Sequence, residues 1–208
     1  MSSPLPEPSP AATRRGAHCS SCGARYGPVS GWPRTCPSCG DVAYRNPLPV
    51  AVALVPVVAD LEDAPCVALA ESGTAGTAGA GRADRGATGL VVITRTIEPA
   101  YGTLALPGGF IDHREDWRHA VVRELAEETG IEASYEEVAL ADVLSSPDGH
   151  LLLFGLLPPR PASALPPSAP TAETDGWSLL RSPATLGFPL HTTAAQKWFA
   201  GGYADRTP

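Results

Sequence analysis

The chain has 208 residues, enough for one ordinary domain with a hydrophobic core and a smaller second unit. Its 43% of hydrophobic residues argues against a fully disordered protein, and its net charge of −7 gives no general attraction to nucleic acid. No apolar run approaches the roughly 18 residues of a membrane span, which argues against a transmembrane protein.

The first section of the chain, residues 1–17, is rich in proline and serine. It begins MSSPLPEPSPAATRR and has no apolar core of the kind that a secretory signal carries. We expect this section to be a disordered tail and the protein to be cytoplasmic.

Four of the five cysteines lie in the next section, residues 18–45, as the pairs Cys19-x2-Cys22 and Cys36-x2-Cys39. In a cytosolic chain, such pairs indicate a metal site before they indicate disulfides. Four thiolates at this spacing suit tetrahedral Zn²⁺ and leave no open ligand position. We therefore expect a structural zinc ribbon over residues 18–45, with His18 as a bystander. The fifth cysteine, Cys66, is expected in the core.

The charge of this predicted ribbon bears on nucleic-acid binding. Its arginines outnumber its one acidic residue, Asp41, but a zinc tetrathiolate adds two negative charges. Tyr26 and Trp32 are the rings that we expect to be exposed there. We infer a structural or interaction role and expect no nucleic-acid partner.

From Asn46 onward the chain has the pattern of a mixed α/β domain. Residues 47–58 form a nearly continuous β-rich run, typical of a strand covered on both faces. Further strands are expected at 66–70, 90–97, 104–110 (leading to a glycine turn), 138–144, 150–157 and within 171–180. A closing helix is expected at 192–203, and flexible loops at 73–89 (Gly/Ala-rich) and 158–172 (Pro-rich).

The strongest helical pattern lies between Asp116, a candidate N-cap, and Gly130, a natural helix stop. At about 100° per residue, Trp117 and Val121 lie on one apolar stripe. The stripe then continues into carboxylates, which is unexpected for a face that begins by burying a tryptophan.

These carboxylates are Glu124 and Glu128, with Glu127 beside them. At spacings of i,i+3 and i,i+4 their Cβ atoms lie about 5–6 Å apart, so the charges repel one another. A hard divalent cation such as Mg²⁺ removes that penalty. Gly108 and Gly109 just ahead can bring the backbone close enough to supply a carbonyl ligand. A solvated acidic face, the simplest alternative, explains neither the stripe nor the paired glycines.

The same residues carry a family resemblance. The fixed positions of the Nudix box, G-x5-E-x7-R-E-U-x-E-E-x-G-U with U aliphatic, are filled by Gly109, Glu115, Arg123-Glu124-Leu125, Glu127-Glu128, Gly130 and Ile131. The resemblance covers roughly Pro47 to Tyr203. It implies a Nudix domain over residues 46–203, with an α/β/α sandwich fold and a mixed sheet, after the zinc ribbon. It also implies hydrolysis of a nucleoside diphosphate linked to another group, dependent on Mg²⁺ or Mn²⁺.

The resemblance also implies roles for single residues. Glu124 and Glu128 become the principal metal ligands, and Glu127 a further ligand or the base. Gly109 offers its carbonyl, while Arg123 and Glu115 orient the cluster. Many members of the family place one more acidic residue on a later loop; Glu173 and Asp175 are the two candidates for that position here.

A zinc ribbon before a Nudix domain resembles the NADH pyrophosphatases and their ADP-ribose- and FAD-cleaving relatives. The stretch 144–155 lacks the S-Q-P-W-P-F-P aromatics of the NADH enzymes. We therefore rank ADP-ribose first as substrate, then NADH or NAD, then FAD, with AMP released.

Phe188 is interpreted as a core residue or as an adenine-stacking ring. Dimerisation is common among such relatives, so a homodimer stays open. The alternative is a non-catalytic nucleotide sensor whose ribbon contacts DNA or a protein.

Overall fold

The computed structural model describes residues 16–27, 31–58 and 87–206. The chain divides into two compact units, residues 1–46 and 47–208. The expected strand at 66–70, the lone Cys66, most of the loop at 73–89 and nearly all of the tail lie outside the described residues. No helix in the described part of the chain is long and apolar enough to cross a membrane.

The smaller unit contains one short antiparallel pair of strands, β1 (Arg34–Thr35) and β2 (Val42–Ala43). Its small core is made by Cys19, Cys36 and Tyr26. A core of this size buries too little apolar area to be stable alone, so such a unit needs a further cross-link.

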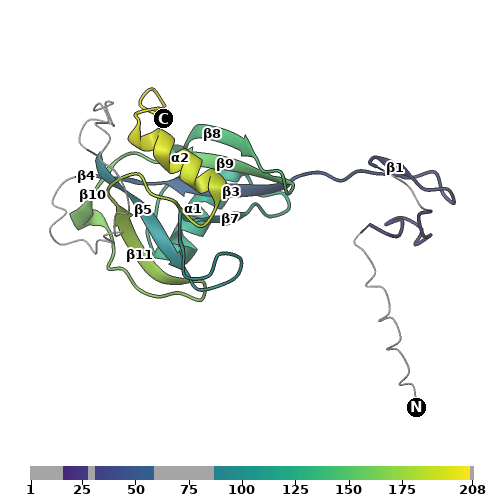
Figure 1. Cartoon of the computed structure of the whole chain (residues 1–208), viewed down its shortest axis with the longest axis horizontal. Coiled ribbons are helices and arrows are strands. Elements are labelled where there is room, and N and C mark those ends of the chain that lie inside the picture. The colour runs from purple at the N-terminus through teal and green to yellow at the C-terminus, as the bar shows by residue number, and fades with distance from the viewer. Residues whose placement is uncertain (1–15, 28–30, 59–86, 207–208) are drawn as a thin grey trace, which may run out of the picture. The chain divides into compact units, whose positions relative to one another are not determined.

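The larger unit contains two mixed sheets (Figure 1). The first has the strand order β7-β3-β9-β8 and is formed by β3 (Leu48–Leu54), β7 (Gly108–Phe110), β8 (Ala139–Ser145) and β9 (His150–Leu156). The second has the order β10-β4-β5-β11, with β6 also paired to β5. Its strands are β4 (Pro56–Val58), β5 (Ala87–Arg95), β6 (Leu104–Ala105), β10 (Arg160–Pro161) and β11 (Thr174–Leu180). Strand β3 runs parallel to β9 and antiparallel to β7.

The run 47–58, expected as one strand, is divided between the two sheets. Strand β3 ends at Leu54, and β4 begins at Pro56 in the other sheet. The expectation of burial on both faces is confirmed for Ala51 to Val57, which are all buried, but not for the start of the run, where Leu48 is 47% exposed. Hydrophobicity alone could not show the division, because a buried run has the same composition in one sheet or in two.

Each of two helices packs on its own core. Helix α1 (Trp117–Thr129) packs with Ala51, Ala53 and residues of the second sheet, whereas α2 (Pro189–Phe199) packs with Val52 and Leu54 on the opposite side of β3. The expected α/β/α arrangement is therefore present.

The loop expected at 158–172 contains β10 and a 3-10 turn, η3 (Ala162–Ala164). Another such turn, η2 (Tyr135–Glu137), precedes β8.

The approach of α1 to the first sheet depends on a missing side chain. A Cβ atom at Gly155 of β9 would lie 2.7 Å from a methyl group of Val138 and 2.9 Å from one of Val121. Glycine at this position therefore lets Val121 pack directly on the β9 backbone. The height of α1 above the sheet, and so the position of its carboxylates, depends on this contact.

Candidate functional site

Helix α1 presents the candidate ligands. The side chain of Asp116 accepts a hydrogen bond from the Arg118 N–H at 2.8 Å, and Gly130 ends the helix in the left-handed conformation. Both predicted caps are thus confirmed. Val121 and Leu125 are buried in the core, whereas Trp117 is only partly buried. The hydrophobic stripe therefore begins at the second turn of the helix.

Glu124 and Glu128 follow the stripe as expected. Glu128 is 3% exposed, and the side chain of Glu124 is 13% exposed. Glu127 points outward and is mostly exposed. The helix thus carries two enclosed carboxylates and one at the edge of the site.

The two glycines lie against these carboxylates, in strand β7. The stretch 104–110, expected as one short strand leading to a glycine turn, is divided into β6 (Leu104–Ala105) and β7 (Gly108–Phe110). The Gly108 N–H donates to Oε2 of Glu128 at 2.8 Å. A Cβ atom at Gly109 would lie 2.5 Å from the carboxylate of Glu124, and one at Gly108 would collide with the carbonyl oxygen of Ala51. Strand pairing of β7 with β3 therefore brings bare backbone onto the acidic end of α1.

Arg123 holds the surrounding carboxylates. Its Nε and one terminal nitrogen bind both oxygens of Glu115, at 2.8 and 2.9 Å. The other terminal nitrogen reaches Glu124 at 2.7 Å and Glu127 at 3.3 Å. Arg123 thus joins three carboxylates, those of Glu115, Glu124 and Glu127. The hydrogen bonds from Arg123 lower the pKa of Glu115 to about 2, so Glu115 stays ionised.

The two enclosed carboxylates, Glu124 and Glu128, have raised pKa values, in contrast to Glu115. Burial raises the pKa of Glu128 to about 8, and the nearby charge of Glu124 adds to this effect. Burial also raises the pKa of Glu124. Two enclosed carboxylates beside a bare glycine backbone form a set of hard oxygen donors, and a divalent cation would offset their mutual repulsion. The residues present therefore fit Mg²⁺ or Mn²⁺.

A cavity of about 740 Å³ opens over the cluster. Its lining includes Gly109, Glu124, Glu127, Glu128 and Glu173. The segment that carries Glu173 is tied to the end of α1, because Thr174 Oγ1 donates to the carbonyl oxygen of Glu128 at 3.0 Å. Asp175 is exposed and does not line the cavity. Of the two loop candidates, the structure brings Glu173 to the cluster and leaves Asp175 outside it.

A buried histidine, which the sequence analysis did not single out, supports the glycine segment. His191 of α2 accepts a hydrogen bond at Nδ1 from the Leu106 N–H, at 3.2 Å. Burial, reinforced by the charge of Arg95, lowers the pKa of His191 to about 3, so the ring stays neutral. A signal was available in the sequence: His191 shares the i, i+3, i+4, i+7 spacing of the buried residues Ala194, Ala195 and Trp198.

The four paired cysteines converge in the smaller unit. Their Sγ atoms all lie within 4.8 Å of one another, with Cys19 and Cys39 at 3.7 Å and Cys22 and Cys36 at 3.6 Å. Four sulfurs at about 2.3 Å from one tetrahedral Zn²⁺ would be about 3.8 Å apart. The cluster therefore fits a zinc ion.

The rings around this cluster differ from the expectation. Tyr26 is 7% exposed rather than free, because it packs on Cys19 and Cys36. Trp32 is half-buried, with the guanidinium carbon of Arg34 4.5 Å from its ring centroid. Tyr44 is the exposed ring in this part of the chain. His18 is not part of the cluster, as expected.

Comparisons with known proteins agree with this geometry. Residues 77–199, more than half of the chain, match the NUDIX domain family. Over 67 residues the chain is 42% identical to an ADP-ribose pyrophosphatase from Methanocaldococcus jannaschii. This match covers 30% of the chain and 38% of that protein, well under two thirds of the relative's length.

The fold has a counterpart among solved structures. A crystal structure of a NUDIX hydrolase from Nitrosomonas europaea matches with a TM-score of 0.59 at 17% identity, covering 91% of this chain and 94% of that chain. The family match includes the acidic helix, the glycine pair and the arginine that joins Glu115 to Glu124. The chain belongs to the NUDIX family of hydrolases.

Proposed function

We propose that the chain is a metal-dependent pyrophosphohydrolase that cleaves a nucleoside diphosphate linked to another moiety and releases AMP. One observation carries this proposal: two enclosed carboxylates, Glu124 and Glu128, meet a bare glycine backbone at the floor of a 740 Å³ cavity. A cavity of this size accommodates a nucleotide-sized ligand.

The cation would be held by Glu124 and Glu128, with Glu127 and the carbonyl oxygen of Gly109 completing the protein ligands. A bound Mg²⁺ or Mn²⁺ would supply charge neutralisation of the diphosphate and a more acidic water. Glu115 and Arg123 act behind the ligands. Glu115 accepts two hydrogen bonds from Arg123 and so fixes the orientation of its guanidinium. The guanidinium in turn holds the carboxylate of Glu124 in position.

The reaction adds water across the diphosphate bridge. The water oxygen forms a bond to one phosphorus, the bridging P–O bond breaks, and the second phosphate leaves with the other product. A carboxylate at the cavity receives the proton of the water. We assign this role to Glu173, because it lines the cavity without contacting Arg123; Glu127 is the alternative.

The substrate order remains ADP-ribose first, then NADH or NAD, then FAD. The relative from M. jannaschii is named an ADP-ribose pyrophosphatase, which supports the first rank. The cavity lining also includes the apolar side chains Val50, Phe110, Leu152 and Leu190, which can cover a nucleobase. The cysteine cluster is assigned a structural Zn²⁺ that holds the small unit together.

Product identification by chromatography tests the proposal. The protein is incubated with Mg²⁺ and, separately, ADP-ribose, NADH, NAD, FAD and a nucleoside triphosphate. We expect AMP from ADP-ribose, no AMP in the presence of a chelator, and loss of turnover in Glu128→Gln. Glu136→Gln is the matched control, since Glu136 is exposed and lies outside the cavity.

A negative result has a definite meaning in this design. If the folded, metal-loaded protein binds ADP-ribose but forms no AMP from any substrate of the panel, the enzyme assignment fails. The non-catalytic sensor then becomes the better explanation.

A further inference from the structure

The backbone of the candidate base, Glu173, is fixed on both sides. Its N–H donates to Oγ1 of Thr171 at 3.3 Å, and its carbonyl oxygen accepts from the Thr96 N–H at 2.8 Å. Oγ1 of Thr171 also accepts from the Thr174 N–H at 3.2 Å, and the Thr171 N–H donates to the Thr174 carbonyl oxygen at 2.8 Å. A threonine hydroxyl that accepts from the backbone two residues on closes a tight turn. Glu173 therefore reaches the cavity from a turn whose backbone is held in place.

Thr174, the next residue, joins this turn to helix α1. It is 0% exposed and is not among the residues that line the cavity. Its Oγ1 donates to the carbonyl oxygen of Glu128 at 3.0 Å. That carbonyl lies in the last turn of α1, where the backbone carbonyls have no partner within the helix. The hydroxyl of Thr174 therefore supplies a partner that the helix itself cannot.

A β-bulge explains why a hydroxyl is needed at this place. β11 pairs with β5 through Thr174 and Arg95, and the next pair is Trp177 with Ile93, so β11 contains one extra residue. Such a bulge interrupts the ladder, and strand pairing alone does not fix the residues within it. The Gly176 N–H donates to Oγ1 of Thr174 at 3.2 Å. One hydroxyl thus joins the bulge to the end of α1.

This hydroxyl lies between two residues that bring carboxylates to the cavity, Glu128 on α1 and Glu173 just before β11. Burial raises the pKa values of Glu124 and Glu128, and the charge of Glu173 adds to both effects, so the three carboxylates lie within electrostatic range of one another. A base must come within hydrogen-bond reach of the attacking water, and a misplacement of about 1 Å can lower a rate by about 10²-fold. The rate therefore depends on whatever fixes Glu173 relative to Glu128.

We propose that Thr174 is a positioning residue, whose buried hydroxyl fixes the distance between Glu128 and Glu173. The inference rests on the proposed function for the roles of these two carboxylates. Thr174 does not line the cavity, so it acts through Glu173 rather than on the substrate. Valine has nearly the shape of threonine but no hydroxyl, whereas serine keeps the hydroxyl, so the two substitutions separate shape from hydrogen bonding.

A second buried threonine of α1 provides a matched control. Thr129 is 4% exposed, and its Oγ1 donates to the carbonyl oxygen of Leu125 and accepts from the Ile131 N–H at 3.1 Å. Both partners belong to the end of α1 rather than to the turn of Glu173. Thr129→Val therefore removes a buried hydroxyl from the same end of the helix and leaves the turn in place.

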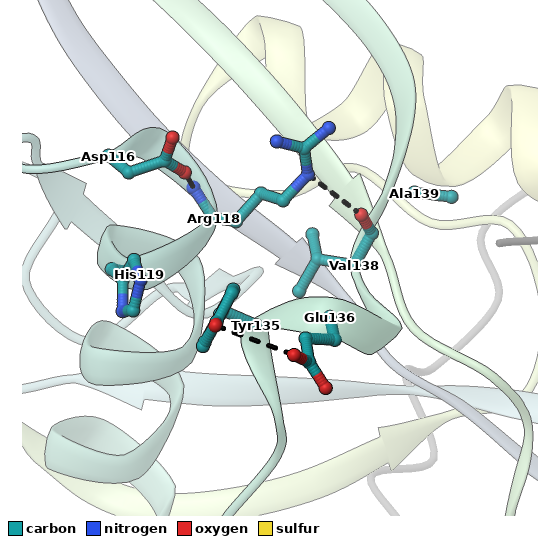
Figure 2. A pocket seen from close by; sticks show the side chains of 7 residues that line it. All are labelled: Asp116, Arg118, His119, Tyr135, Glu136, Val138 and Ala139. Atoms are coloured by element: carbon teal, nitrogen blue, oxygen red, sulfur yellow. Dashed lines mark hydrogen bonds between the residues drawn. The ribbon is translucent and has the colours of Figure 1, made fainter.

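Figure 2 shows a control for the loss of a carboxylate. Glu136 lies in a separate hollow beside η2, together with Arg118 and His119, and the Tyr135 hydroxyl is 3.5 Å from its Oε1. Glu136 is exposed and does not line the acidic cavity. Glu136→Gln therefore removes one carboxylate without changing the cluster around Glu128.

Steady-state kinetics test the inference, with Mg²⁺ and the substrate of the panel that yields AMP, ADP-ribose by the rank above. We expect Thr174→Val to lower kcat by about 10–100-fold with KM nearly unchanged, because substrate binding is kept while the base is displaced. Thr174→Ser should keep most of the rate. Thr129→Val should keep it as well, although its melting temperature falls. Thr174→Ala removes the same hydroxyl and takes the place of Thr174→Val if the valine variant does not fold.

A double-mutant cycle shows whether Thr174 acts through Glu173. In the Glu173→Gln background, Thr174→Val should cause little further loss of kcat, because the proton acceptor is already absent. In the Glu136→Gln background, Thr174→Val should cause its full loss.

Three results would overturn the inference: wild-type turnover by Thr174→Val, an equal loss of kcat in Thr129→Val, or losses that multiply when Thr174→Val is combined with Glu173→Gln. In each of these cases AMP formation by the wild type leaves the proposed function intact. A wild type that forms no AMP from any substrate of the panel would instead overturn the proposed function, and this inference with it.

Discussion

Gly109 and Glu124 are so close that no side chain fits between them: a Cβ atom at Gly109 would lie 2.5 Å from both carboxylate oxygens of Glu124. The substitution Gly109→Ala must therefore displace this carboxylate. Because Glu124 is a candidate metal ligand, we expect the affinity for Mn²⁺ and the rate of AMP release to fall by about 10–100-fold.

Metal titration followed by electron paramagnetic resonance measures the first effect, and chromatography the second. Gly27→Ala is the control, since a Cβ atom there meets no atom within 4 Å. Unchanged Mn²⁺ affinity in a folded Gly109→Ala protein would remove Glu124 from the ligand set.

Glu173 and Asp175 form a natural pair for testing the base. They lie two residues apart, but only the first lines the cavity. We expect Glu173→Gln to reduce kcat by about 10²–10⁴-fold with KM nearly unchanged, because proton removal is lost while binding is kept. Asp175→Asn should behave as wild type. If Glu173→Gln and Asp175→Asn both turned over as fast as wild type, Glu127 would be the better candidate for the base.

Arg123 is expected to be irreplaceable by lysine. One ammonium cannot bind Glu115 through two parallel hydrogen bonds and also reach Glu124. We expect Arg123→Lys to lower the free energy of unfolding by about 1–3 kcal/mol, since partly buried carboxylates lose charge-assisted bonds. Urea unfolding measures this change, and Arg206→Lys on the surface is the control. A stability equal to wild type would mean that the network contributes little to folding.

His191 predicts a dependence of stability on pH. Its folded-state pKa is lowered to about 3, by burial first and by Arg95 second, whereas an unfolded histidine titrates near pH ~6.5. Between these values the unfolded chain binds a proton that the folded chain does not. The free energy of unfolding therefore falls with falling pH over this window, by up to about 1.4 kcal/mol per pH unit for this group.

In His191→Gln this contribution is absent, while the amide oxygen can still accept from the Leu106 N–H. We expect a flatter profile of unfolding free energy between pH about 6.5 and 4. His119→Gln is the control, because His119 is exposed. A profile as steep as that of the wild type would show that His191 is not the group responsible.

The cysteine cluster predicts about one zinc ion per chain by elemental analysis. Removing one thiolate in Cys39→Ser should lower zinc retention after dialysis against a chelator, whereas Ser20→Ala should not. Folded wild-type protein that contains no zinc would contradict the assignment. A melting transition of the small unit that disappears on chelation would support it.

The sequence predicted what local rules determine. The bounds of α1 follow from Asp116 and Gly130, and the acidic continuation of its apolar stripe follows from helical periodicity. The burial of Ala51 to Leu54 on both faces of β3 follows from the continuous hydrophobicity of this stretch. These features need no knowledge of distant partners, so pattern and capping chemistry suffice.

Features that depend on distant partners could not be predicted. A strand was expected over 104–110, but not that its end, Gly108–Phe110, pairs with Val50 to Val52, more than fifty residues earlier. Tyr26 is buried because it packs on Cys19 and Cys36. The sequence around Gly155 predicts only a strand. The need for glycine there comes from the contact with Val121 of α1, which only the folded structure shows.

The passage of one buried segment through both sheets has a mechanical consequence. Between β3 and β4 the chain changes sheet at Val55 without an intervening loop, and the cavity is lined by residues from both sheets. The sheets cannot slide apart without stretching this covalent joint or breaking the pairing on either side of it. The joint therefore limits how far the two sheets can separate, and we expect adaptation to substrates of different length to come mainly from the side chains and loops at the rim of the cavity.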